Sequence, residues 1–211
     1  MREDKTQKYS QIYEKNKSNT LLDETRYILL LTVVDKCLEY RGSVCECGVY
    51  KGGSAAGILE IVSEKDAERP IHLFDTFAGV PNDLKSKKSF DKHHKFDDYS
   101  IDEFKKNFIM YDNLYFHIGR IPDTLVDVES EEFIFVHIDM NYYYPTKTAL
   151  NFFYKHLSPN GVILVDDYGF DMYKDTVKRA VDEFSEENGV DMYPIDTGQC
   201  MIYNFLEGRN E

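Results

Sequence analysis

Short apolar runs alternate along this chain with segments in which apolar residues recur every three or four positions. The first pattern is typical of buried strands and the second of amphipathic helices. Strands are expected at 44–47, 70–75, 114–118, 133–138 and 162–165, with a closing hairpin of 192–195 and 200–205. Helices are expected at 23–40, 53–62, 101–110, 145–157 and 177–184, with Pro145 at a first helical position and a turn at 158–161. This alternation predicts an α/β fold with a mostly parallel sheet and one antiparallel strand.

The segment from Ser43 to Val62 organises the rest of the pattern. Its apolar run contains one acid, Glu46, and the turn that follows contains Gly48, Gly52 and Gly53. Glycines allow positive φ angles and let a ligand approach the backbone closely. The helix that begins after the turn has free N–H groups and a partial positive charge at its N-terminus. Together these features predict a strand–turn–helix unit that binds a nucleotide-like cofactor.

The chain divides into a short N-terminal segment and one domain. Residues 1–22 are charged and unpatterned, which predicts a tail or a mobile lid helix, and residues 23–211 are expected to form a single domain. Within that domain, 78–100 is polar, contains two histidines and shows no periodicity. A loop of this length in a compact domain is usually functional or disordered, so 78–100 is expected to be a mobile active-site loop.

Composition narrows the classes of partner and the cellular location. The chain has 211 residues and a formal net charge of −13, which argues against a nucleic-acid partner because such binding needs a basic face. No apolar run reaches the roughly 18 residues of a membrane span. The first residues are too polar for a signal peptide. The four cysteines lack zinc-site spacing, so buried reduced thiols and a cytoplasmic location are expected.

Acids follow the predicted strands at their carboxyl ends, where open parallel sheets bind their ligands. Asp75 ends the second strand about 20 residues beyond the turn, a position that suits an acid for a cofactor ribose. Asp139, Asp166 and Asp167 follow two later strands. Converging carboxylates repel one another unless a cation or protons intervene, and magnesium prefers such oxygen ligands. Spacing alone leaves two interpretations open: a metal site, or one helix-capping aspartate beside others that are merely solvated.

The glycine turn does not match two common cofactor-binding patterns. It lacks the G-x-G-x-x-G spacing of dinucleotide sites and the lysine that precedes the serine of a phosphate-binding loop, here Ser54. Tyr143 and Lys147 make a Y-x-x-x-K motif like that of short-chain dehydrogenases. Ser130, upstream of this motif, would be the serine of the same catalytic set. However, the strand between Ser130 and Tyr143 would hold them roughly 20 Å apart. An NAD-dependent oxidoreductase and a non-catalytic cofactor-binding module therefore remain as alternatives only.

Six segments occur in the order seen in one known family: ECGVYKGGSA, LFDTFAGVP, GRIPDTL, HIDMNYYYPTKTAL, LSPNGVILVDDYG and AVDEF. From about residue 25 to residue 205, the chain resembles the macrocin O-methyltransferase family, which includes metal-dependent sugar methyltransferases. The resemblance implies a Rossmann-like class I methyltransferase fold, with a seven-stranded sheet, an antiparallel last strand and helices on both faces. It also implies S-adenosylmethionine as cofactor and Mg²⁺ or another divalent cation.

The resemblance further implies roles for individual residues. Asp139, Asp166 and Asp167 match the family's metal positions, and Asn141 stands where the family commonly has a second acid. The acid within the first buried strand, Glu46, is expected to face the cofactor. The full set of implied cofactor-binding residues is Glu46, Gly48, Gly52, Ser54, Asp75, Thr76, Gly119 and Asp139.

The implied function is transfer of a methyl group to a hydroxyl of a sugar, a glycosylated natural product or a polysaccharide precursor. A divalent metal lowers the pKa of a coordinated hydroxyl, and a nearby base then removes its proton. His94 in the polar loop is the favoured histidine base, and Asp139 is the other catalytic candidate. His93, His117 and His137 are also considered, although His137 fits a core position better. A homodimer through the N-terminal helix is a further expectation.

Overall fold

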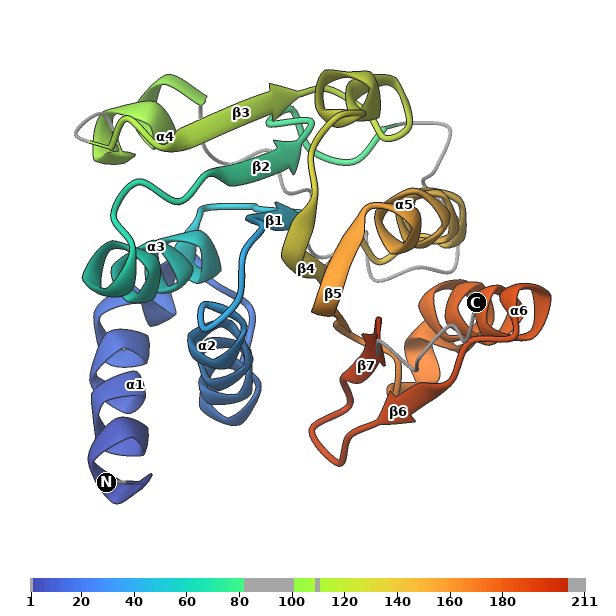
Figure 1. Ribbon diagram of the computed structural model, residues 1–211, viewed down its shortest axis with the longest axis horizontal. Helices are drawn as coiled ribbons and strands as arrows, with labels where there is room; N and C mark the ends of the chain where they lie inside the picture. The colour runs from blue at the N-terminus through green and yellow to red at the C-terminus, as the bar shows by residue number, and fades with distance from the viewer. Residues whose placement is uncertain (1, 82–100, 109–110, 205–211) are drawn as a thin grey trace.

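The computed structural model describes residues 2–81, 101–108 and 111–204. Its strands form one seven-stranded sheet in the order β3-β2-β1-β4-β5-β7-β6 (Figure 1). Neighbouring strands run parallel from β3 to β5, whereas β7 pairs antiparallel with both β5 and β6. The predicted mostly parallel sheet with an antiparallel last strand is confirmed. The strands are β1 (Ser43–Cys47), β2 (Ile71–Asp75), β3 (Leu114–Ile118), β4 (Phe133–Ile138), β5 (Leu157–Val165), β6 (Met192–Pro194) and β7 (Cys200–Tyr203).

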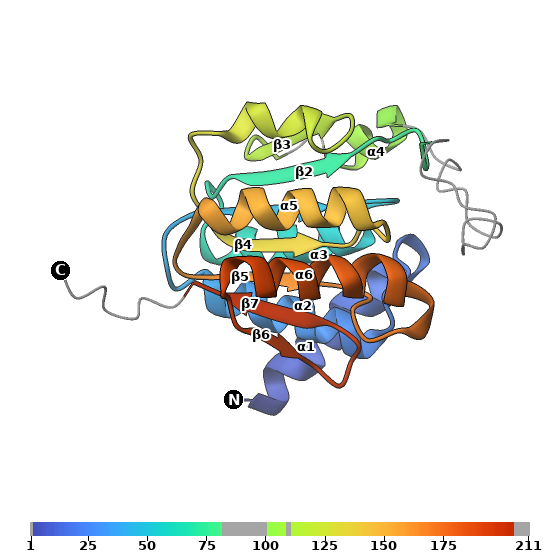
Figure 2. The same cartoon turned by 90° about the vertical axis from the view of Figure 1, so that its right-hand side faces the viewer.

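Helices cover both faces of the sheet (Figures 1 and 2). Each face buries its own hydrophobic core, one beneath α2 and α3 and the other beneath α5 and α6. The first face is covered by α1 (Arg2–Asn16), η1 (Lys17–Asn19), α2 (Glu24–Cys37), α3 (Gly53–Lys65) and α4 (Ile101–Phe108). The second is covered by η3 (Asp123–Val128), α5 (Tyr143–Lys155), η4 (Asp171–Tyr173), η5 (Lys174–Lys178) and α6 (Arg179–Asn188).

The central strands β1 and β4 are buried along their whole length. Strands covered by helices on both sides appear in sequence as continuous apolar runs, which is why β4 could be predicted so clearly. Two polar residues interrupt this pattern, Glu46 of β1 and His137 of β4, and they are register partners in the sheet. The four cysteines are free and buried, as predicted, and Cys45 and Cys47 share one face of β1 with their sulfurs 3.7 Å apart.

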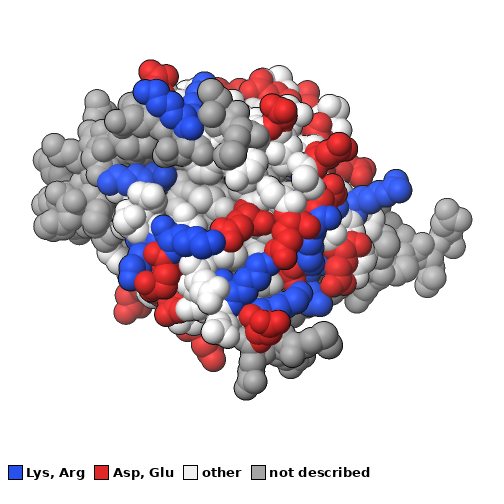
Figure 3. Space-filling model, turned by 90° about the vertical axis from the view of Figure 1, so that its left-hand side faces the viewer, with Lys and Arg blue, Asp and Glu red and all other residues white. Residues whose placement is uncertain are grey.

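The N-terminal segment, expected to be a tail or a lid helix, forms a helix that packs on its own chain. In α1, Tyr9 and Ile12 are buried in the core shared with α2 and α3. Lys5 also pairs with the carboxylate of Asp35 in α2, at 2.6 Å. Figure 3 shows acidic and basic side chains interleaved over this face of the molecule. Since exposed ion pairs contribute little individually, the two buried side chains are the main anchors of α1.

Two local predictions differ from the structure. Residues 158–161, expected as a turn, belong to β5. There Asn160 has a left-handed φ of 64°, and its N–H donates to the carbonyl of Asn204 at 3.0 Å, which keeps this irregular stretch in the sheet. Pro145 is the third residue of α5 rather than the first. It is tolerated because N–H groups of the first helical turn have no acceptor within the helix.

Most of the expected 78–100 loop, including His93 and His94, lies outside the described residues. Its first residues are described, and Gly79, Val80 and Pro81 line the cleft at the carboxyl edge of the sheet. None of the described helices combines the length and the apolar character needed to cross a bilayer.

Candidate functional site

A cleft of about 340 Å³ opens at the carboxyl edge of the sheet. Its walls are built from the segments that follow β1 to β5 and from Thr20–Leu22, which precede α2. Open parallel sheets bind their ligands at this edge, and the volume is typical of a small-molecule site. The cleft is therefore the candidate site among the described residues.

Unusual backbone conformations gather at the same edge. Four non-glycine residues just beyond β1, β2, β4 and β5 have positive φ: Tyr50 (52°), Phe77 (48°), Asn141 (63°) and Asp167 (63°). Left-handed conformations of this kind cost about 1–3 kcal/mol each and occur often at functional sites. Tyr50, Asn141 and Asp167 line the cleft, so the strain lies where a ligand would bind.

Close approaches within the protein require two glycines of the turn after β1. Gly48 has a φ of 89°, and a Cβ there would lie 1.8 Å from the carbonyl oxygen of Asp139. Gly52 caps α3 with a φ of 81°, and its Cβ would lie 2.3 Å from the ring of Phe104. Packing thus explains both glycines. Gly48 also lines the cleft, whereas Gly52 is not among the lining residues.

The Asp75 carboxylate fastens the end of β2 to the glycine turn. Its Oδ2 accepts hydrogen bonds from the N–H groups of Val49 at 2.8 Å and Tyr50 at 3.0 Å. Its Oδ1 accepts from the N–H of Phe77 at 2.8 Å. The Thr76 hydroxyl, which donates to the Gly79 carbonyl at 2.7 Å, also lies 3.5 Å from Asp75 Oδ1. A carboxylate can accept about four hydrogen bonds, so Asp75 is largely satisfied, and a ligand hydroxyl would replace this long Thr76 contact.

The other predicted acids meet at the ends of β4 and β5. One oxygen each from Asp139, Asp166 and Asp167 lies within 4.8 Å of the others. Burial raises the pKa of all three carboxyls, and the neighbouring acids raise the pKa of Asp139 further and that of Asp167 to about 7. Asp166 Oδ1 is buried without a hydrogen-bond partner among the described residues. This donor set suits a hard divalent cation.

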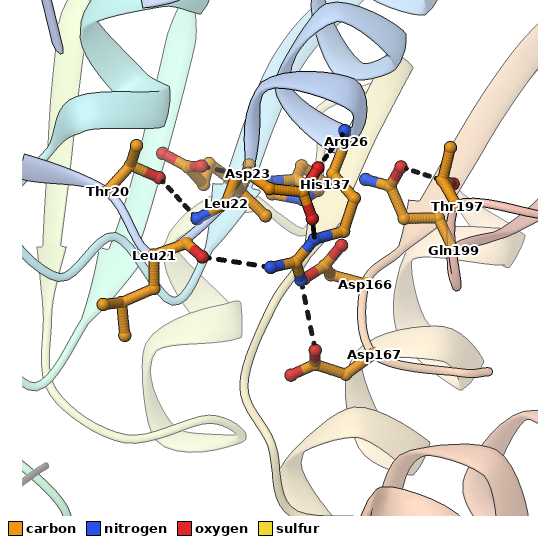
Figure 4. A network of polar contacts seen from close by, with 11 residues as sticks. Thr20, Leu21, Leu22, Asp23, Arg26, His137, Asp166, Asp167, Thr197 and Gln199 are labelled. Atoms are coloured by element: carbon orange, nitrogen blue, oxygen red, sulfur yellow. Dashed lines mark hydrogen bonds and ion pairs between the residues drawn. The ribbon is translucent and has the colours of Figure 1, made fainter. Parts of the chain in front are cut away.

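Arg26, which the sequence motifs did not reveal, supplies positive charge to this cluster (Figure 4). Its Nη1 donates to Asp166 at 2.6 Å and to Asp167 at 3.3 Å, while its Nε donates to Asp23 at 2.9 Å. One signal was present in the sequence. Arg26 stands in the first turn of α2, where the helix dipole disfavours a cation, so an acidic partner was to be expected. The identity of that partner, 140 residues away, could not be deduced.

Glu46 lies within the sheet instead of in the cleft wall. It is fully buried, its Oε1 lies 2.9 Å from Nδ1 of His137, and it is not among the residues that line the cleft. His137 is also fully buried, as expected for a core histidine. Glu46 Oε2 and His137 Nε2 have no hydrogen-bond partner among the described residues. In this structure the Glu46 carboxylate thus contacts His137, and its expected contact with a cofactor stays a prediction.

The other predicted residues separate into two groups. Ser54, Thr76 and Gly119 line the cleft together with the acids. His117 does not line the cleft. Its ring nitrogens lie 3.0 Å from His72 and 3.1 Å from Asp127. It therefore cannot serve as the base in this conformation.

Apolar side chains surround the mouth of the cleft. Leu21, Phe170 and Met172 line it and are 46%, 37% and 59% exposed. Tyr143 and Lys147, the dehydrogenase-like pair, point elsewhere and bind acids of α6. That motif consequently belongs to helix packing and not to the cleft.

The strand order, the antiparallel β7 and the cleft at the carboxyl edge define a class I methyltransferase fold. The structure of the O-methyltransferase NovP shares this fold, with a TM-score of 0.66 and 25% sequence identity. The match covers 84% of this chain and 80% of NovP. The family model described as Macrocin-O-methyltransferase (TylF) matches residues 18–203, so the chain belongs to that family.

Two curated relatives are similar over most of this chain. The 8-demethyl-8-(2,3-dimethoxy-alpha-L-rhamnosyl)-tetracenomycin-C 4'-O-methyltransferase of Streptomyces olivaceus is 25% identical, over 74% of this chain and 63% of the relative. The mycinamicin III 3''-O-methyltransferase of Micromonospora griseorubida is 27% identical, over 77% of this chain and 67% of the relative. The chain thus spans less than two thirds of the length of the first relative.

Proposed function

We propose that this protein is an S-adenosylmethionine-dependent O-methyltransferase that acts with Mg²⁺ or another divalent cation. Its acceptor would be a hydroxyl of a sugar, a glycosylated natural product or a polysaccharide precursor. The observation that carries the proposal is the convergence of Asp139, Asp166 and Asp167 at the cleft of a chain that belongs to the macrocin O-methyltransferase family. Both relatives carry O-methyltransferase in their names, and one name includes a rhamnosyl group.

The cofactor would lie along the turn after β1 and the end of β2. Gly48 and Ser54 line this part of the cleft, and Asp75 lies beside Thr76 and Gly119. Asp75, which keeps its three backbone donors, would accept a ribose hydroxyl in place of the long 3.5 Å contact from the Thr76 hydroxyl. Asp139 would contact the cofactor from β4. Gly52 and Glu46 do not line the cleft, so they would contribute to cofactor binding indirectly, Gly52 as the cap of α3 and Glu46 through its contact with His137.

The three converging acids would hold the divalent cation. They supply hard oxygen donors, among them the unpartnered Oδ1 of Asp166. A bound cation would lower the pKa of a coordinated acceptor hydroxyl and orient its oxygen. The amide of Asn141 also lines the cleft, and its buried Oδ1 lacks a hydrogen-bond partner among the described residues. Asn141 would therefore orient the acceptor in place of the family's second acid.

S-adenosylmethionine would supply the methyl group and would leave as a neutral thioether whose sulfur keeps the electron pair of the broken carbon–sulfur bond. The acceptor oxygen would form the new bond to the methyl carbon, and a base of this chain would take the hydroxyl proton. Asp139 is the proposed base in the cleft wall, and His94, outside the described residues, is the second proposed base. Much of the acceleration would come from alignment of oxygen, carbon and sulfur.

The mouth of the cleft favours an acceptor with an apolar part next to its sugar. Leu21, Phe170 and Met172 present exposed apolar surface there. Such surface is typical of a site that binds a ligand. A homodimer remains part of the proposal, and light scattering of the purified chain would test it.

A methyl-transfer screen tests the proposed function. The full chain is incubated with methyl-labelled S-adenosylmethionine and a panel of glycosylated and nucleotide-sugar acceptors, with Mg²⁺ or with a chelator. We expect labelled product from at least one acceptor in Mg²⁺ and none with the chelator. Calorimetry should show binding of S-adenosylmethionine, whereas binding of NAD alone would contradict the proposal.

A further inference from the structure

One guanidinium group both neutralises the acid cluster and holds a wall of the cleft. Arg26 Nη1 donates to Asp166 at 2.6 Å and to Asp167 at 3.3 Å, and the arginine side chain is only 12% exposed. Its Nη2 donates to the carbonyl of Leu21 at 3.0 Å, and its guanidinium carbon lies 5.3 Å from the centre of the Phe170 ring. Figure 4 shows the guanidinium between Leu21 and the two aspartates.

This position is electrostatically demanding for an arginine. The positive end of the α2 dipole disfavours a cation in the first turn, and burial removes its hydration. Asp23 compensates in part, because its carboxylate caps α2 and also accepts from Arg26 Nε at 2.9 Å. Asp166, Asp167 and the nearby Asp139 supply further attraction. The carboxylates that would serve as metal ligands are therefore among the groups that hold the arginine in place.

A divalent cation would need the same carboxylate oxygens. Two cations within about 4 Å of each other repel strongly where water is largely excluded. We propose that Arg26 competes with the divalent cation for Asp166 and Asp167, so that cation binding displaces the guanidinium. This inference rests on the divalent cation of the proposed function. It makes Arg26 a positioning residue that sets how tightly the cation is held.

Displacement would also reach the cleft wall. Thr20–Leu22 line the cleft, and the hydrogen bond from Arg26 to the Leu21 carbonyl ties this segment to the acids. Phe170, which packs against the same guanidinium, lies at the cleft mouth. When the guanidinium leaves the acids, Thr20–Leu22 is no longer linked to them through this hydrogen bond. Cation binding and the conformation of the acceptor end of the cleft are thus coupled.

Direct measurement of Mn²⁺ binding tests the competition without any methyl acceptor. Free Mn²⁺ is measured by electron paramagnetic resonance in titrations of the full chain and of Arg26→Met and Arg26→Lys. We expect Arg26→Met to bind Mn²⁺ at least about tenfold more tightly than the unchanged protein, with Arg26→Lys in between. The matched control is Arg69→Met. Arg69 is also buried and paired with an acid, but it binds the carbonyls of Tyr40 and Gly42 before β1.

Hydrogen exchange of the peptide that covers 18–24 provides a second readout that needs no variant. Its amides should exchange faster when Mn²⁺ is added to the unchanged protein. Equal or weaker Mn²⁺ binding by Arg26→Met, or unchanged exchange, would overturn the competition alone. If neither protein bound Mn²⁺ at millimolar concentration, the divalent cation of the proposed function would fail, and the competition with it.

Discussion

One single acid and one trio of acids lie at the same edge of the sheet, and their surroundings differ. Asp75 accepts three backbone hydrogen bonds and joins two loops. Asp139, Asp166 and Asp167 face one another, with raised pKa values and one buried oxygen that lacks a partner among the described residues. The only guanidinium that the described contacts place on the cluster is that of Arg26.

The difference separates an acid that backbone donors satisfy from three acids that repel one another. Backbone donors satisfy Asp75 before any ligand arrives, so its removal should damage the fold. Repulsion within the trio destabilises the folded protein, and such destabilisation is retained where function needs it. Substitutions in the two groups should therefore change stability and activity in different proportions.

The largest expected effect is on activity at Asp139. Asp139→Asn keeps the shape but removes one charge from the trio, so methyl transfer should fall at least about 100-fold. The same change relieves repulsion, so the unfolding temperature should stay equal or rise. Rates with labelled S-adenosylmethionine and thermal unfolding would check both parts. If Asp139→Asn kept full activity in the presence of a chelator, neither Asp139 nor the cation would take part in the mechanism.

Asp75 should show the reverse balance. Asp75→Ala leaves the N–H groups of Val49, Tyr50 and Phe77 without their acceptor, which should lower the free energy of unfolding by about 2–3 kcal/mol. Urea unfolding at neutral pH measures this loss. Asp75→Asn is the matched control, because its amide oxygen keeps part of the bonding and should lose less. Equal stability of Asp75→Ala and the unchanged protein would show that Asp75 serves only a ligand.

His72 is a buried titratable group in the β2–β3 half of the sheet. Burial, and then the nearby His117, lower the pKa of His72 from 6.5 to about 4, while Glu131 acts in the opposite direction. As the pH falls, His72 is protonated in the unfolded chain before it is protonated in the folded protein. The stability that depends on neutral His72 is therefore complete above pH 6.5 and declines as the pH falls toward 4. Between pH 7.5 and pH 5 the loss should be about 2 kcal/mol.

The measurement for His72 is urea unfolding at the two pH values. His72→Phe should lose this part of the pH dependence, since phenylalanine keeps an aromatic ring beside Tyr115 but cannot titrate. His156→Gln, on α5's C-cap, is the control and should retain it. A His72→Phe curve parallel to that of the unchanged protein would assign the pH dependence to other groups.

The contrast between the acids also shows what sequence can reveal. Asp75, Asp139 and Asp166 each end or follow an apolar run, and the rule for parallel sheets brings the ends of such runs together. Sequence could not show whether an acid there would be satisfied, because the donors to Asp75 are backbone groups of another loop. Nor could it show Arg26 at the cluster, since the contact closes a separation of 140 residues.

The packing of the N-terminal helix on its own chain could not be predicted for a different reason. Tyr9, Ile12 and Tyr13 have helical spacing, but they are few among charged residues, and a weak stripe carries little information without the surface that it packs on. That surface is formed by α2 and α3, which follow α1 in the chain, and it exists only once they have packed together. The core strands had no such dependence, because burial on both faces leaves a continuous apolar run.

The smallest expected effect concerns Glu46, which is buried within β1 and belongs to neither group. Glu46→Gln keeps an oxygen for the hydrogen bond to His137, so stability should change by less than about 1 kcal/mol. Because Glu46 does not line the cleft, the affinity for S-adenosylmethionine should stay within about threefold, measured by calorimetry. A tenfold weaker affinity with unchanged stability would place the Glu46 charge against the cofactor. Glu46 would then be a third kind of acid, beside the satisfied Asp75 and the repelling trio: a buried acid that acts on the cofactor through its charge.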